Sequence, residues 1–174
     1  MASKITALLL IIAISLLQLS VLAQKKTAAA LPRNNTETAN STTIHQEVDF
    51  NVSPGRLYET LLDSKQFSEF ASLLGEFSAN SARIDPSVGG AFSLFDGHIT
   101  GRNIELVPNQ RIVQAWRAAN WPAGVYSVVK FELEKQGSGT HLVLDHTGFA
   151  GGLHDGLASG WQSHYWDPLT QHFK

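Results

Sequence analysis

The chain has 174 residues, of which 43% are hydrophobic, and it carries a formal net charge of −2 at pH 7 and no cysteine. This length suits one domain, and the scattered Lys and Arg residues argue against nucleic acid as a partner, because nucleic acid requires a clustered basic surface. The absence of cysteine excludes thiolate nucleophiles, redox pairs and any zinc site that uses sulfur.

Residues 1–23 have the three parts of a secretory signal peptide. Lys4 gives a basic start, an uncharged apolar stretch follows, and small residues close the segment at Val21 and Ala23. We expect cleavage after Ala23 and export of the mature chain, to the outside of the cell, a periplasm or a secretory lumen, with no membrane attachment afterwards. The alternative is an uncleaved anchor, because roughly 20 apolar residues span a bilayer.

Residues 24–43 are small and polar and show no apolar periodicity. This composition predicts a flexible polar leader ahead of the folded part. The leader contains N-x-[ST] motifs at Asn34 and Asn40. We expect glycans on both if the source is a eukaryote, whereas in a bacterial protein the motifs carry no meaning.

The folded domain is expected over residues 44–174, and it begins with a strand. From Ile44 to Val52 one parity is mostly apolar and the other is polar, which is typical of a half-buried strand. Ser53 then has the character of a helix N-cap, with Pro54 at the first helical position. Apolar residues at helical spacing continue to Gly75.

A run of strands separated by turns follows. Asp96-Gly97 lies between two alternating segments and favours a hairpin, Pro108 marks a second turn, and the KQGSG segment marks another hairpin. Helical spacing returns from about Leu153. The order predicts an α+β fold, with one curved antiparallel sheet of about six strands wrapped on a long C-terminal helix.

The last helix carries an apolar stripe at four-residue spacing, which predicts packing on the concave face of the sheet. Pro168 removes a backbone donor and clashes with the preceding turn, so we expect a kink between Tyr165 and Asp167. The stripe consists of Leu153, Leu157, Trp161 and Tyr165, with Leu169 beyond the proline.

A set of short marks is spread over residues 44–173, each of them weak by itself. They are Val52-Ser53-Pro54 with Leu57-Tyr58, Gly89-Gly90-Ala91-Phe92, Asp96-Gly97 with Gly101, Pro108 before Ile112-Val113 and Trp116, Val129-Lys130-Phe131, Gly139-Thr140 with Leu142, Leu144 and His146, and Gly160-Trp161 with Tyr165. In this order and at these intervals they resemble the START-like (SRPBCC) superfamily with its helix-grip fold. Within it, the chain is most similar to the group named for the C-terminal domain of the activator of heat-shock protein 90 ATPase.

The resemblance implies a cavity between the sheet and the last helix. We therefore expect a protein that binds a small apolar or amphipathic ligand and needs no cofactor, with apolar burial supplying the affinity. Trp121, on a loop between strands, is expected to cover the cavity mouth or to anchor the surface. The candidate ligand-binding wall residues are Phe92, Trp116, Phe131, His146, Trp161 and Tyr165. The alternative is that the same side chains form a plain core.

Two other functions stay open. The family name implies a protein-interaction module that stimulates a chaperone ATPase. The group is usually cytoplasmic, and we expect a short leader here in place of the domain that precedes this one in its activators. An enzyme is the other: some START-like relatives cyclise or hydrate ligands with pocket residues, and His146 is the candidate general base. We assign no catalytic residue, because no carboxylate or nucleophile pairs with His146. Its alternative role is to bond a buried backbone group or the Tyr165 hydroxyl and fix the helix.

Seven histidines raise the question of a metal site. Zinc needs three or four ligands held by further partners. His154 and His164 are ten residues apart, so they do not share one helix face. We expect no metal site.

Overall fold

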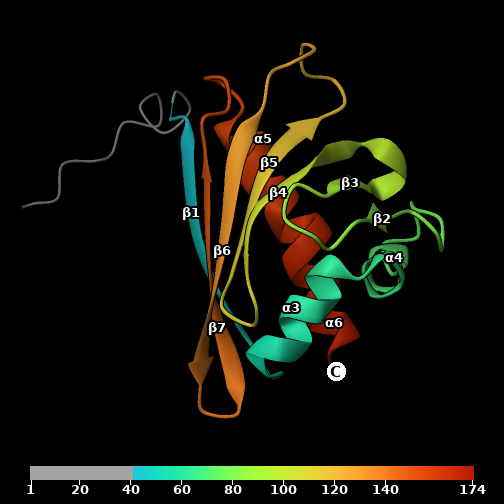
Figure 1. The fold of residues 1–174 in the computed structure, drawn as a ribbon, viewed down its shortest axis with the longest axis vertical. Coiled ribbons are helices and arrows are strands. Elements are labelled where there is room, and N and C mark those ends of the chain that lie inside the picture. The colour runs from blue at the N-terminus through green and yellow to red at the C-terminus, as the bar shows by residue number, and fades with distance from the viewer. Residues whose placement is uncertain (1–40) are drawn as a thin grey trace, which may run out of the picture. The chain divides into compact units, whose positions relative to one another are not determined.

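The computed structural model describes residues 41–174. The predicted signal peptide, its cleavage after Ala23, and the motifs at Asn34 and Asn40 lie outside the described residues. The described part forms one antiparallel sheet in the order β1-β7-β6-β5-β4-β3-β2 (Figure 1). Its strands are β1 (Thr43–Phe50), β2 (Arg83–Ile84), β3 (Ala91–Leu94), β4 (Ile99–Val107), β5 (Arg111–Ala118), β6 (Ser127–Gln136) and β7 (Gly139–Thr147).

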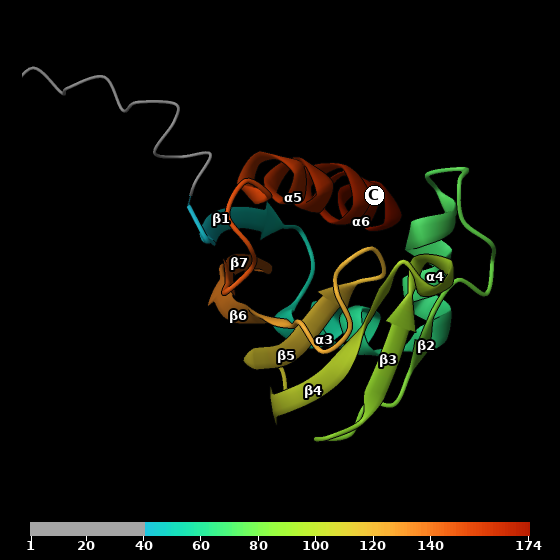
Figure 2. The ribbon, with the colours of Figure 1, turned by 90° about the horizontal axis from the view of Figure 1, so that it is seen from above.

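Helices cover the concave side of this sheet. Figure 2 shows the sheet bending round from β1 to β2, with α5 and α6 lying across its open side. The helices are α3 (Pro54–Leu62), α4 (Ser64–Ser72), α5 (His154–Trp161) and α6 (Asp167–His172), with a 3-10 turn η2 (Phe95–Gly97) and a π turn η3 (Gln162–Trp166). The predicted α+β helix-grip fold is confirmed, with seven strands instead of about six because β2 adds a short edge strand.

The structure contains the helix start and the hairpin turn that the sequence predicts at Ser53-Pro54 and Asp96-Gly97. Ser53 caps α3 by accepting a hydrogen bond from the Arg56 amide at 3.3 Å, and Pro54 is the first helical residue. The β3–β4 hairpin turns at η2, where Phe95 and Asp96 both have positive φ. The Asp96 carboxylate holds this turn by accepting hydrogen bonds from the Ser78 amide and hydroxyl.

The C-terminal helix passes through Pro168 without a break. The backbone is helical at Asp167 (φ −63°, ψ −51°), and the Asp167 amide donates to the Gln162 carbonyl, five residues back. This π turn adds a residue to the turn, so Tyr165 and Trp166 are both buried. The sequence predicted a kink near Tyr165–Asp167 caused by Pro168; the helix instead continues through Pro168 and has a π turn over Gln162–Trp166.

Gln46 on β1 ties this helix to the sheet. Its amide oxygen accepts from the Trp166 indole N–H at 2.7 Å, and its amide nitrogen donates to the Ala158 carbonyl at 3.1 Å. A polar residue on the inward parity of β1 thus has both of its groups satisfied by the C-terminal helix, as buried polar groups require. These two bonds fix the helix relative to the strand.

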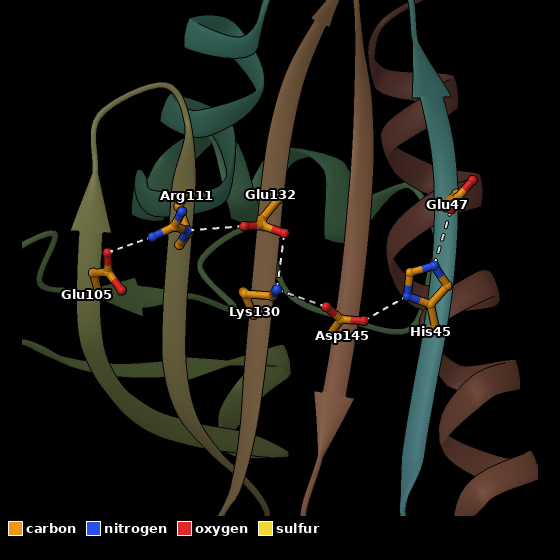
Figure 3. Close-up of polar contacts among 7 residues, drawn as sticks. All are labelled: His45, Glu47, Glu105, Arg111, Lys130, Glu132 and Asp145. Carbon is orange, nitrogen blue, oxygen red and sulfur yellow. Dashed lines mark hydrogen bonds and ion pairs between the residues drawn. The ribbon is translucent and has the colours of Figure 1, made fainter.

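The outer face of the sheet carries a network of ion pairs and hydrogen bonds that runs from β4 through β5, β6 and β7 to β1 (Figure 3). Its contacts are 2.7 to 3.3 Å long. Asp145 is central: it bonds His45 at 2.7 Å and Lys130 at 3.0 Å, and both bonds hold the pKa of the Asp145 carboxyl below its ordinary value. The network consists of Glu105, Arg111, Glu132, Lys130, Asp145, His45 and Glu47.

Replacing Asp145 with Asn is expected to lower the pKa of His45. The hydrogen bond to Asp145 is the largest of the effects that raise the pKa of His45 above 6.5, and the bond to Glu47 is the next. A titration of the His45 ring by proton NMR measures the change. The matched control is Glu132→Gln. Glu132 is separated from Asp145 by Lys130 in the same network of contacts, so this substitution should leave the His45 pKa unchanged. An unchanged His45 pKa in Asp145→Asn would contradict the pairing.

Candidate ligand-binding cavity

A cavity of about 400 Å³ lies between the C-terminal helix and the sheet. The helix side comes from α5 and η3, and the sheet side comes from β4 and β5 with the loop at residues 119–126. Its floor is aromatic, formed by Trp116, Trp161 and Tyr165. The ring centroids of Trp116 and Trp161 are 6.0 Å apart, and those of Trp161 and Tyr165 are 4.4 Å apart.

Glycines on α5 leave the space open. Gly156 and Gly160 are one turn apart and both line the cavity. A Cβ built at either position meets nothing within 4 Å outside the backbone of its own helix. Side chains at these two positions would project into the cavity, so their absence helps to explain why the space between α5 and the sheet is not filled.

The structure brings together three of the six wall residues named from the sequence, which are Trp116, Trp161 and Tyr165. Phe92 and Phe131 line a different and much smaller space of about 10 Å³. Side chains of α3 and α4 close that end of the sheet, with Leu61 and Phe67 on the same small space. Sequence parity placed these phenylalanines on the correct face, but it did not distinguish the packed end from the open end.

His146 lies outside the cavity lining and is fully buried. Its Nδ1 accepts from the Trp161 indole N–H at 3.1 Å, so its proton is on Nε2. Nε2–H donates to the Ser127 hydroxyl at 2.7 Å, and that hydroxyl donates to the Trp116 carbonyl at 3.1 Å. Burial lowers the pKa of His146 to about 4.

This network gives His146 a positioning role. Both ring nitrogens are engaged, so neither is available to a substrate, and the ring connects β7 to the C-terminal helix through Trp161. Of the two roles considered for His146, the structure therefore shows the one in which it fixes the helix, and not that of a general base. Its partner on the helix is Trp161 and not Tyr165.

One polar group at the aromatic floor lacks a protein acceptor, and a second polar group lies close to it. The Trp116 indole N–H is buried and has no hydrogen-bond partner among residues 41–174. The Tyr165 hydroxyl lies near this indole, close enough for the indole to act on the pKa of the phenol. Burial raises the pKa of the Tyr165 phenol, and the neighbouring Trp116 indole opposes this effect only in part. A buried donor without an acceptor is uncommon in proteins.

The mouth of the cavity is polar. His98 and His164 line it, and each donates its Nδ1–H to a backbone carbonyl, those of Phe95 at 2.6 Å and Gly160 at 3.2 Å. In the neutral ring this leaves Nε2 as an acceptor. None of the residues that line the cavity in the described part of the chain is Asp, Glu, Lys or Arg.

Sequence reasoning missed several residues of the lining, including Phe95, His98 and Leu157 as a wall residue. Phe95 has positive φ, which a bulky residue seldom adopts, so no pattern signalled its place. Trp121 is 8% exposed and packs edge-on against Trp116 at 5.5 Å, so it covers the cavity and does not anchor an exposed surface.

Residues 41–174 contain neither a metal-binding cluster nor a membrane-spanning helix. No group of three or more His, Asp or Glu side chains is arranged to hold a metal ion in that part of the chain. Across the same residues, no helix has the length and apolar character needed to cross a bilayer.

A curved antiparallel sheet that grips a C-terminal helix, with a cavity between them, defines a START-like helix-grip domain. The chain belongs to the family described as activator of Hsp90 ATPase homolog 1-like protein, whose model matches residues 51–174.

Several relatives of the chain are Hsp90 ATPase activator homologues. Homolog 2 from Mus musculus is 32% identical over 97 residues, which are 56% of this chain and 29% of that protein. Homolog 1 from Homo sapiens is 27% identical over 124 residues, 71% of this chain and 35% of that protein. The chain spans about a third of the length of these curated relatives.

A solved structure shows the same fold. The crystal structure of an HSP90 activator from Plasmodium falciparum superposes with a TM-score of 0.65 at 24% identity, covering 74% of this chain and 94% of that one. At this identity the similarity establishes the helix-grip architecture alone.

Proposed function

We propose that this protein binds a small apolar or amphipathic molecule in the cavity between the sheet and the C-terminal helix. The observation that carries the proposal is the cavity itself, because about 400 Å³ lies within the range of roughly 300–1,000 Å³ for small-molecule sites. Its aromatic floor supplies apolar area for affinity. Gly156 and Gly160 keep the space open.

Gly160→Leu tests this proposal, because the new side chain enters the cavity. We expect the purified protein to bind N-phenylnaphthylamine, a neutral dye that fluoresces in apolar surroundings, with one saturable site. Gly160→Leu should lose this binding. Ser159→Leu is the matched control: it places the same side chain on the same helix at an exposed position outside the cavity, and it should bind the dye normally. Equal binding by both variants would overturn the proposal.

A second candidate is interaction with a chaperone, supported by the relatives that are named activators of the 90 kDa heat shock protein ATPase. The chain corresponds to about a third of those proteins, so their activity is a hypothesis for this one. The test is the ATPase rate of a purified Hsp90-type chaperone with and without an excess of this protein. A rate increase supports interaction, and an unchanged rate at saturating excess rejects it.

We also propose that the chain is exported and cleaved after Ala23. The support is the composition of residues 1–23, with its basic start, apolar middle and small residues at the end. Intact-mass measurement of the protein recovered from the exporting host should show a chain that begins at Gln24, with glycan mass on Asn34 or Asn40 if the host is a eukaryote. Full-length protein retained in the membrane fraction would contradict cleavage.

A further inference from the structure

We infer that the cavity takes an uncharged aromatic compound whose carbonyl oxygen accepts hydrogen bonds from the Trp116 indole N–H and the Tyr165 hydroxyl. This inference rests on the proposed function and names the chemical class of its ligand.

The two donors define the inner end of the ligand. Trp116 is 4% exposed and Tyr165 is 5% exposed, and they reach the cavity from opposite sides, from β5 and from η3. The Trp116 N–H has no acceptor in the described part of the chain. A ligand oxygen between these groups gives the indole N–H the acceptor that it lacks, and it takes a second bond from the phenol. A carbonyl oxygen suits this position because its two lone pairs accept both bonds.

The charge of the lining sets the charge of the ligand. No Asp, Glu, Lys or Arg lines the cavity in the described chain. A carboxylate or phosphate oxygen placed at Trp116 would be a buried anion without a counter-charge, which is costly. The acceptor at the inner end is therefore a neutral oxygen.

The aromatic walls define the body of the ligand. Trp116 already makes edge-to-face contact with Trp121 at 5.5 Å, and Phe95 does so with Tyr165 at 5.3 Å. A planar ring system in the cavity extends this pattern, which aromatic pairs prefer. At the mouth, His98 presents an acceptor nitrogen in its neutral form, so the carbonyl is directed inward to the donors.

Three probes that share one ring system separate the effect of the carbonyl from the effects of the aromatic body and the charge. Fluorenone carries the carbonyl, fluorene lacks it, and fluorene carboxylate is charged. We expect the purified protein to bind fluorenone more tightly than fluorene, by roughly three- to tenfold, which is the net effect of a neutral hydrogen bond. The carboxylate should bind more weakly than either. Calorimetric titration measures all three.

Trp116→Phe keeps an aromatic ring and removes the N–H. In this variant fluorenone should lose its advantage over fluorene, because the N–H that bonds the carbonyl is removed. The smaller ring acts on both probes alike, so the ratio of their affinities is the readout. Tyr165→Phe should reduce the advantage in part. A destabilised fold would weaken both probes equally, so the ratio of the two affinities reports the hydrogen bond.

The outcomes distinguish this inference from the function beneath it. If the cavity binds N-phenylnaphthylamine but takes fluorene and fluorenone equally, prefers the carboxylate, or takes none of the three, the carbonyl inference is overturned and the binding function stands. If neither the dye nor any probe binds, or if Gly160→Leu binds them all unchanged, the binding function itself fails.

Discussion

Gly101→Ala is expected to lower the free energy of unfolding by about 3 kcal/mol or more, as a forced overlap in a packed interior does. Gly101 on β4 lies opposite Trp116 on β5 and Phe92 on β3. A Cβ at this position would come closer than 3.0 Å to the Ala115 carbonyl oxygen and to the Phe92 ring. The Ala115 oxygen is part of the backbone of β5, so it cannot rotate away as a side chain does. Urea unfolding measures the loss.

Gly160→Ala is the control for this prediction. Its Cβ meets nothing within 4 Å beyond its own helix, and alanine is favoured over glycine inside a helix by roughly 0.5–1 kcal/mol. The two substitutions are chemically identical, so a loss in Gly101→Ala together with a small gain in Gly160→Ala assigns the effect to the overlap. Equal stability of the two variants would contradict the packing of Phe92 over Gly101.

The free energy of unfolding is expected to fall by about 3 kcal/mol as the pH is lowered from about 6.5 to 4, through His146 alone. In the folded state His146 stays neutral down to a pKa of about 4, because the ring is buried. In the unfolded chain the ring takes up a proton near its ordinary value of 6.5. Between these values the unfolded state binds more protons, so acid favours unfolding.

His146→Leu isolates this contribution. The variant should be less stable at neutral pH, since the Trp161 N–H and the Ser127 hydroxyl lose their partner. It should also lose the His146 part of the pH dependence between 6.5 and 4. His45 and His141 act with the opposite sign, since their raised pKa values give stability that is lost as the pH rises through them. They are present in both proteins, so the difference between the two stability curves cancels them. Parallel curves would show that His146 does not titrate as described.

Much of the fold could be predicted because its signals are local. The alternation from Ile44 to Val52, the Ser53-Pro54 cap and the Asp96-Gly97 turn each depend on neighbouring residues alone, and the structure contains the elements that they indicate. The apolar stripe of the last helix likewise identified Trp161, Tyr165 and Leu169 as buried, whereas Leu153, which it also included, is exposed.

The π turn was beyond such reasoning. A period of 3.6 residues excludes Trp166 from the stripe that contains Tyr165. The extra residue in the turn brings both into the core, and Gln46, 120 positions away, holds Trp166 there. A long-range hydrogen bond of this kind leaves no trace in a sequence window.

The site could be predicted only in part for a similar reason. Trp116, Trp161 and Tyr165 were assigned from their place on the helix and the sheet, and they line the cavity. Phe92 and Phe131 share the same inward face, but α3 and α4 cover their end of it. Which end of a sheet stays open depends on where helices end, and this follows from tertiary packing.

The most direct test of the ligand site is the nitrogen–proton NMR spectrum of the indole groups during a titration with fluorenone. The chain has four tryptophans, and Trp116→Phe assigns the Trp116 signal. We expect this signal alone among the four to move far downfield and to saturate, because its N–H gains an acceptor. Trp166, already bonded to Gln46, should stay in place as an internal control. If the Trp116 signal does not move while fluorenone is present in excess, the cavity does not hold a ligand in the way described.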